Sequence, residues 1–205
     1  MKDVERASQT FDEIAEHFDM TRNRPWKEVV EFLESCDGSL LDMGCGNGRH
    51  TLTAEEMGLD VLGLDASRNL LRIASSRTDS DFVRGDVKEL PFKGTSFDNV
   101  IYVAAIHHLS EGSEESLSEV RRVLKWGGRV LVSSWARELD RWDLEEDERE
   151  VLVPWHRDDG EIVERYYRLY TLDELREEVE KSGLEVVEYY RSGENNYVEG
   201  RKNQS

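Results

Sequence analysis

The sequence predicts an α/β protein built on a parallel β-sheet. From residue 39 onward, short apolar runs typical of buried strands alternate with segments of helical periodicity, as happens when crossover helices join parallel strands. A glycine-rich turn at 44–48 follows the first strand and precedes a helix. With 205 residues, 38% of them hydrophobic, the chain is long enough for one domain with a substantial core.

Each expected element rests on a local signal. Strands are expected at 39–43, 60–64, 81–83, 97–104, 130–134 and 184–190, with 196–200 closing the sheet as an antiparallel partner. Helices are expected at 3–18, 25–36, directly after the glycine-rich turn, and at 67–76, 114–125 and 171–181. Pro25 suits a first helical turn, Ser67 is a helix cap, and Thr171 with Glu174 has capping-box spacing. The pair Gly127-Gly128 ends the fifth helix.

The composition excludes several classes of protein. No apolar run approaches the ~18 residues of a membrane-spanning helix, and the first ten residues are charged rather than signal-like, so we expect a cytoplasmic protein without a membrane partner. Cys36 and Cys45 are too few for a disulfide framework and lack zinc-site spacing, so no metal site is expected. The 45 acidic and 27 basic residues give a net charge of -18, which argues against non-specific binding of nucleic acid.

Only seven of the 27 basic residues are lysines. An acidic, lysine-poor surface stays hydrated in concentrated salt, which screens the repulsion among carboxylates, and this suggests the hypothesis of a halophilic source. An ordinary acidic cytosolic enzyme is the alternative. Full folding stability in dilute buffer, measured in a KCl titration, would exclude the halophile hypothesis.

The glycine-rich turn predicts a nucleoside-binding site. Glycines at alternate positions of Gly44-Cys45-Gly46-Asn47-Gly48 let a ligand approach bare backbone N–H groups, and Asp65 at the end of the next strand can accept both hydroxyls of a ribose. A tight turn without a ligand is the alternative. Nicotinamide-binding folds also carry such an acid, but here the spacing is GxGxG with Asp42 before it, and a third-strand acid occurs in Gly85-Asp86-Val87.

Those residues resemble the class I S-adenosylmethionine-dependent methyltransferases, and Leu90-Pro91-Phe92, Phe97-Asp98 and Gly127-Gly128 match at the usual spacing. The resemblance implies a three-layer Rossmann-like fold with a mostly parallel seven-stranded sheet and helices on both faces. It also implies S-adenosyl-L-methionine as cofactor. Asp42, Gly44, Gly46 and Gly48 would then bind the amino-acid end, Asp65 the ribose, and Asp86 with Val87 the adenine. A turn residue that caps a backbone N–H is the alternative for Asp86.

Three further segments are similar to one subfamily, the wobble-uridine tRNA methyltransferases that esterify 5-carboxymethyluridine. They are 11–26, with Thr21-Arg22-Asn23-Arg24-Pro25-Trp26; 105–110, with Ile106-His107-His108-Leu109; and 152–167, with Pro154-Trp155 and Arg165-Tyr166-Tyr167. The chain departs from the family pattern at Phe11, where Tyr is expected, and at Tyr197, where Trp is expected. A methyltransferase for quinones or metabolites and a cofactor-binding scaffold without catalysis are the alternatives.

The resemblance divides residues 1–205 of a single domain into four segments. These are an N-terminal helical segment (1–38), a cofactor-binding core (39–135), a substrate-side insertion (136–170) in which charges alternate with aromatic residues, and a C-terminal helix with strands (171–205). The aromatic residues of the insertion are expected either to stack nucleobases or to fill the core.

Site residues on the acceptor side follow from the chemistry of the implied reaction. A carboxylate is ionised at neutral pH and needs alignment rather than a general base. Arg22 and His107 are the catalytic candidates for positioning it, with a solvated salt bridge and a core histidine as the respective alternatives. Two adjacent residues after a strand point in different directions, which favours His107 over His108. The expected substrate-binding residues are Arg24, Trp26, His108, Trp155, Arg165 and Tyr166.

Two partners are expected. One is the tRNA substrate, bound through local arginine clusters and aromatic side chains. The other is the small zinc-binding activator subunit with which enzymes of the resembled family work. We expect the strand at 81–84 to be a free sheet edge, with Phe82 and Val83 on it and Leu70, Leu71 and Ile73 as apolar neighbours. The activator would pair along 80–84 as an added strand, unless acidic edge residues suffice to protect it.

Overall fold

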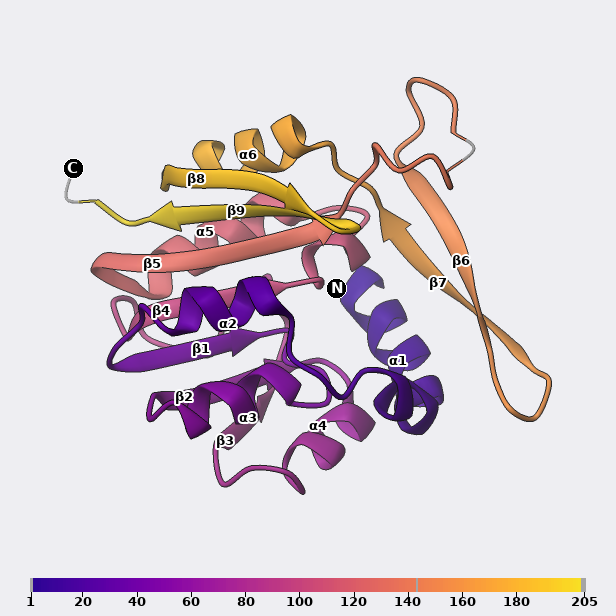
Figure 1. Ribbon diagram of the computed structural model, residues 1–205, viewed down its shortest axis with the longest axis horizontal. Coiled ribbons are helices and arrows are strands. Elements are labelled where there is room, and N and C mark those ends of the chain that lie inside the picture. The colour runs from indigo at the N-terminus through magenta and orange to yellow at the C-terminus, as the bar shows by residue number, and fades with distance from the viewer. Residues whose placement is uncertain (1, 143, 204–205) are drawn as a thin grey trace.

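A computed structural model describes residues 2–142 and 144–203. Seven strands form one sheet in the order β3-β2-β1-β4-β5-β9-β8 (Figure 1). They are β1 (Ser39–Met43), β2 (Asp60–Asp65), β3 (Asp81–Arg84), β4 (Phe97–Val103), β5 (Leu124–Trp135), β8 (Glu185–Ser192) and β9 (Asn195–Arg201). The first five run parallel, and β9 runs antiparallel between β5 and β8. The predicted mostly parallel, seven-stranded α/β fold is confirmed.

Helices cover both faces of this sheet. They are α1 (Lys2–Thr21), α2 (Lys27–Leu33), α3 (Arg49–Glu56), α4 (Arg68–Ala74), α5 (Ser113–Val123) and α6 (Leu172–Lys181), with a 3-10 turn η1 (Ile106–His108). Strand residues alternate between the faces: Val100 and Tyr102 pack toward α5 and α6, and Ile101 and Val103 pack toward α2 and α3. No helix in the described part of the chain has the length and apolar character needed to cross a membrane.

Local capping signals are confirmed, whereas several element boundaries differ from the prediction; α1, for example, continues to Thr21 instead of ending at 18. The Ser67 hydroxyl accepts a hydrogen bond from the Leu70 N–H, and Thr171 forms the expected capping box. Trp26, rather than Pro25, precedes α2 with extended backbone, so that helix starts at Lys27. β5 begins at Leu124 and not near 130, because the backbone around the paired glycines 127–128 continues the pairing through hydrogen bonds with Lys202.

The insertion forms an antiparallel hairpin, β6 (Glu150–His156) and β7 (Ile162–Arg168), which lies at the carboxyl ends of the parallel strands beside α1 (Figure 1). One face of the hairpin packs on α1, where Trp155 and Val163 surround Ile14. The other face stays open, with Leu152 and Ile162 exposed. Helix α1 and the hairpin therefore build walls over the end of the sheet at which ligands bind in this class of fold.

Candidate active site

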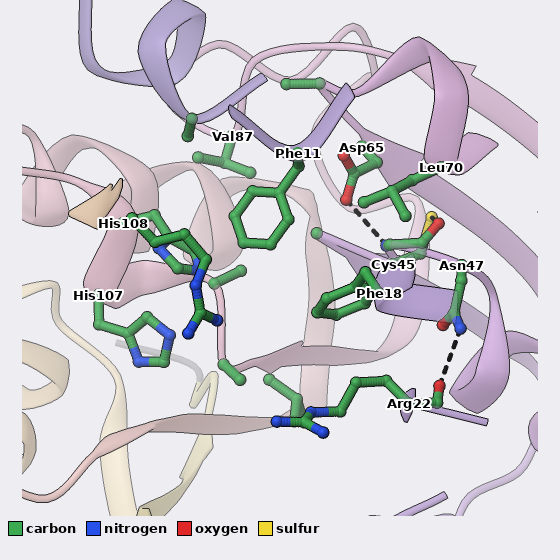
Figure 2. Close-up of a pocket in the computed structure, with 18 of the residues that line it drawn as sticks. Phe11, Phe18, Arg22, Cys45, Asn47, Asp65, Leu70, Val87, His107 and His108 are labelled. Atoms are coloured by element: carbon green, nitrogen blue, oxygen red, sulfur yellow. Dashed lines mark hydrogen bonds between the residues drawn. The ribbon is translucent and has the colours of Figure 1, made fainter. Parts of the chain in front are cut away.

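The candidate active site is a pocket at the carboxyl ends of the central strands, beneath α1 (Figure 2). The strand order reverses between β1 and β4, and open α/β sheets bind ligands at such a switch point. Three groups of residues line most of it. The glycine-rich loop contributes Gly44, Cys45, Gly46 and Asn47; α1 and the residue after it contribute Ala7, Ser8, Phe11, Phe18 and Arg22; and the opposite wall contains His107, His108, Trp135, Arg165 and Tyr167.

The glycine-rich loop and Asp65 form the first part of the pocket. The Asp65 carboxylate accepts hydrogen bonds from the backbone N–H of Gly46 and of Ser67, both at 2.8 Å. Burial raises the pKa of Asp65, and these N–H donors oppose the shift. A Cβ at Gly44 would lie 2.5 Å from the Cβ of Ala105, which is too close for any residue with a side chain, so this loop conformation requires glycine. The carboxylate is thus fixed in the pocket wall, where it fits the ribose hydroxyls of a nucleoside.

Two neutral histidines form the second part. The backbone N–H of Trp135 donates to Nδ1 of His107 at 3.0 Å, which leaves its ring N–H on Nε2. Nδ1 of His108 lies 3.0 Å from the carbonyl oxygen of Tyr166 and must donate to it, so Nε2 of His108 is an acceptor. Burial lowers the pKa of both rings, that of His108 to about 4. At neutral pH both rings are uncharged. His107 presents an N–H at Nε2, and His108 presents a lone pair at Nε2.

Arg165 on β7 is the most unusual side chain of the pocket, because it is only 6% exposed and has no carboxylate partner among the described residues. Its guanidinium lies 4.6 Å from the ring centre of Trp155, and Nη1 donates to the Tyr167 hydroxyl at 2.7 Å. Its Nε is buried without any hydrogen-bond partner. Burial lowers the pKa of this guanidinium, and since arginine stays charged, the site holds a buried cation that lacks an anion.

Other arginines of the pocket also lack carboxylate partners among the described residues. Several arginines outside the pocket pair with carboxylates, as Arg149 does with Glu174 at 2.7 Å. Arg22 and Arg49 line the pocket together with Arg165, and none of the three forms an ion pair within the described residues. Asp65 is the single carboxylate among the described residues that line the pocket. In a protein of net charge -18, the pocket wall facing Asp65 is thus selectively basic, which favours an anionic ligand.

The comparisons with known proteins identify the family. Residues 41–132 match the Methyltransferase domain family. The chain is 32% identical to the tRNA (carboxymethyluridine(34)-5-O)-methyltransferase of Schizosaccharomyces pombe, with 97% of each chain covered, and 35% identical to that of Saccharomyces cerevisiae, with 75% of this chain and 57% of the relative covered. The chain belongs to this methyltransferase family.

Solved structures agree on the fold. The PH0226 protein of Pyrococcus horikoshii matches with a TM-score of 0.73 at 21% identity, covering 97% of both chains. A methyltransferase-like chain of Haloferax volcanii, in complex with the Trm112 methyltransferase activator, matches with a TM-score of 0.76 at 20% identity, covering 97% of this chain and 98% of that one. Family and fold together confirm the predicted S-adenosylmethionine-dependent methyltransferase and its cofactor class.

The predicted cofactor residues occupy four different positions. Four of them line the pocket: Gly44, Gly46, Asp65 and Val87. Gly48 lies behind the loop, where an added Cβ would meet Ala74 at 2.8 Å, so its place is one of packing. Asp86 lines an adjoining groove that shares Ser8 with the pocket. Asp42 lies beneath the loop, 2% exposed, and does not line the pocket.

On the acceptor side the structure also separates the predicted residues. Five line the pocket: Arg22, Trp26, His107, His108 and Arg165. Arg24 is exposed outside it, Trp155 is buried behind Arg165, and Tyr166 lines a smaller neighbouring cavity. The expectation that the two histidines point in different directions does not hold, because both belong to the 3-10 turn η1 and both line the pocket; the preference for His107 stays a prediction.

Several pocket residues were not among the predicted ones. Arg49 and Trp135 line the pocket, and Tyr167 stacks on Trp135 with ring centres 4.1 Å apart. Arg49 directly follows the glycine-rich loop, and Trp135 ends a central parallel strand, which are the positions where such folds place ligand-binding groups. Both positions could therefore have been predicted from the sequence. Tyr167 was recognised only as part of an aromatic insertion.

The position of Asp42 predicts a pH effect on stability. Burial raises its pKa to about 7, and its carboxylate accepts a hydrogen bond from the Thr51 hydroxyl at 2.6 Å. The folded state therefore holds a proton that the unfolded state releases near pH 4, so this group's contribution to stability is lost as the pH rises from about 4 to 7. We expect Asp42→Asn to gain on the order of 2–4 kcal/mol over the wild type at pH 8 and little at pH 4.

Urea unfolding of both proteins at several pH values measures this difference. Cofactor affinity should change less than threefold, because Asp42 does not line the pocket. A stability difference that is constant from pH 4 to pH 8 would contradict the assignment.

Proposed function

We propose that the protein transfers the methyl group of S-adenosylmethionine to the carboxylate of 5-carboxymethyluridine at the wobble position of tRNA. The names of relatives 32–39% identical to this chain support the substrate. The observation that carries the proposal is the buried, unpaired guanidinium of Arg165, because an acceptor carboxylate is the kind of group that this cation lacks.

The chemistry of the pocket matches such an acceptor. When bound, the cofactor supplies an electrophilic sulfonium methyl group. Its fit is supported by Asp65, fixed toward the pocket by two backbone donors, and by the open approach to Gly46. A carboxylate needs no base to become a nucleophile, and the neutral His107 supplies an N–H donor instead of a proton acceptor. Arg22 and Arg165 orient the anion and shield it from water.

The aromatic walls support a planar acceptor. Trp135 and Tyr167 stack with an interplanar angle of 2°, and both face the pocket across from Phe11 and Phe18. A uracil ring can lie between these walls, since stacking on aromatic side chains is how proteins hold unpaired RNA bases. Phe11 approaches the ring of His108 edge-on at 4.8 Å, so the family's tyrosine hydroxyl is not needed to hold that ring.

Incubation with labelled S-adenosylmethionine and tRNA that carries carboxymethyluridine tests the proposal. Nucleoside mass spectrometry should find a methyl ester at that uridine, labile to mild alkali. Matched tRNA with unmodified uridine should take up no label. The net charge of -18 argues against non-specific nucleic-acid binding and keeps a small-molecule methyltransferase as the alternative, so metabolites and quinones form a third arm. Label in that arm alone would refute the tRNA substrate.

A heterodimer with a zinc-binding activator is the second part of the proposal. Among the described residues β3 is the outermost strand and pairs only with β2, so its other edge is open there. The complex of the Haloferax volcanii methyltransferase-like chain with the Trm112 activator supports the kind of partner. The ring of Phe82 packs over Gly63, so a strand added to β3 would also brace the glycine-rich loop. The prediction that Leu70 and Leu71 are apolar neighbours for the activator is wrong, because both side chains are buried.

Co-expression tests this partner. We expect the isolated chain to be poorly soluble and weak in cofactor binding, and the pair to bind S-adenosylmethionine about tenfold more tightly or better, since a partner that binds only the ordered fold stabilises it. Arg84→Pro should abolish pairing, because the Gly85 N–H donates to Asp65 of β2 and the Arg84 N–H therefore lies on the open edge, where a proline ring removes it. A monodisperse single chain as active as the pair would exclude the activator.

A further inference from the structure

We propose that Asn47 is a positioning residue that fastens Arg22 to the glycine-rich loop, so that the cofactor loop and the acceptor side move as one unit. The inference rests on the proposed function for the role of Arg22. Asn47 is 1% exposed. Its side-chain NH₂ donates to the backbone carbonyl of Arg22 (Figure 2) and to the Asp19 carboxylate, each at 2.8 Å.

A ring of polar groups makes this connection rigid. Arg77 forms an ion pair with Asp19 at 2.5 Å and donates to the backbone oxygen of Asn47 at 3.5 Å. The carboxamide, the carboxylate and the guanidinium thus satisfy one another at the end of α1. A buried NH₂ with two acceptors loses both hydrogen bonds if either the loop or the end of α1 shifts alone.

The side chain of Arg22 depends on this anchor, because its one other contact on the acceptor side within the described residues is a distant one, 5.9 Å from the ring centre of Trp155. The guanidinium has no carboxylate partner within the described residues and donates only to the carbonyl of Thr21, at 3.2 Å. Its position relative to the pocket is therefore set by its backbone, which Asn47 holds. Gly46, the neighbour of Asn47, donates its N–H to Asp65. A cofactor that binds against Asp65 and this loop consequently sets the place of Arg22.

Other contacts of α1 provide a matched control. Asn69 donates its side-chain NH₂ to the carbonyl of Asp12 at 2.9 Å, which fastens the middle of α1 to α4. Asn69 does not line the pocket, and the Asp12 carbonyl that it contacts lies in the middle of α1, well before Arg22. Loss of the Asn69 side chain removes one hydrogen bond between α1 and α4 without releasing Arg22 from the loop.

The first experiment is a double-mutant cycle on the chain co-expressed with its activator. Asn47→Asp keeps the size but replaces the NH₂ by an oxygen that faces two acceptors, and Asn47→Ala removes the group without adding charge. Both should lower kcat for tRNA methylation at least tenfold and leave the Kd for S-adenosylmethionine within threefold. In an Arg22→Ala background they should lower kcat by less than twofold. Asn69→Ala should act additively with Arg22→Ala.

The second experiment does not depend on the acceptor. Addition of S-adenosylmethionine should slow amide hydrogen exchange at residues 19–24 in the wild type and in Asn69→Ala, but not in Asn47→Asp. Equal protection in all three proteins, or additive losses of kcat from Asn47 and Arg22 substitutions, would overturn the inference. Normal exchange coupling in a protein that does not methylate tRNA would refute the proposed function and leave the fastening role of Asn47 supported.

Discussion

Arg165→Met is expected to lower kcat/KM for tRNA methylation by about 10- to 150-fold, because one charge-assisted contact to the acceptor carboxylate is worth roughly 1.5–3 kcal/mol. The Kd for S-adenosylmethionine should stay within threefold, since Asp65 and the glycine-rich loop lie on another wall of the pocket. The same substitution should not lower the melting temperature. A buried guanidinium without an anion is costly, and an apolar side chain of similar length removes that cost.

The combination of lost activity and retained or increased stability separates this role from a structural one. Steady-state kinetics and thermal unfolding of the same preparations measure both quantities. Arg176→Met is the matched control, because Arg176 lies on α6 and pairs with Glu180 at 3.0 Å. It should leave the kinetics unchanged. Full activity of Arg165→Met, or its collapse to an unfolded chain, would contradict the assignment of Arg165 to the acceptor.

Asp65→Ala is expected to weaken S-adenosylmethionine binding by about 10- to 150-fold, since ribose hydroxyls would lose a charged acceptor worth roughly 1.5–3 kcal/mol. The loss also has an indirect part, because the carboxylate orients the N–H groups of Gly46 and Ser67 before any ligand binds. Asp65→Asn keeps one oxygen acceptor and removes the charge, so it should fall between the wild type and Asp65→Ala.

Isothermal titration calorimetry with S-adenosylmethionine measures these affinities. Asp60→Ala serves as the control, because Asp60 is an exposed aspartate at the opposite end of the same strand. Unchanged affinity in Asp65→Ala would exclude the ribose contact. A loss of turnover at saturating cofactor, with normal affinity, would place Asp65 on the acceptor side instead.

Local sequence determined much of the fold. The alternation of apolar residues in β4 reproduces the two faces of the sheet, and the hydroxyls of Ser67 and Thr171 begin the helices that they were expected to begin. The glycine-rich loop and Asp65 meet because carboxyl ends of adjacent parallel strands lie side by side. These features depend on hydrogen bonds and periodicities within a few residues, or on the regular geometry of a sheet, so single-chain reasoning reaches them.

The insertion marks the limit of such reasoning. Its aromatic residues were expected either to stack nucleobases or to fill the core. The alternation along β6 and β7 puts Trp155 and Tyr167 on the inner face, where Trp155 packs on α1 and Tyr167 lines the pocket, and puts Tyr166 on the other face. Which face of a hairpin turns inward is fixed by what packs against it. That partner, α1, lies far from it in the sequence.

The sequence by itself determined the class of the protein, the position of its candidate cofactor site, and the basic and aromatic residue types of the candidate acceptor side. The tertiary structure alone decided which of those residues meet. It left Arg24 outside the pocket and Asp42 beneath it, and it left Arg165 buried without an anion. The reason is that burial and pairing depend on contacts between distant segments, here α1, the glycine-rich loop and β7, and a buried charge becomes informative only when every neighbour that could neutralise it is known.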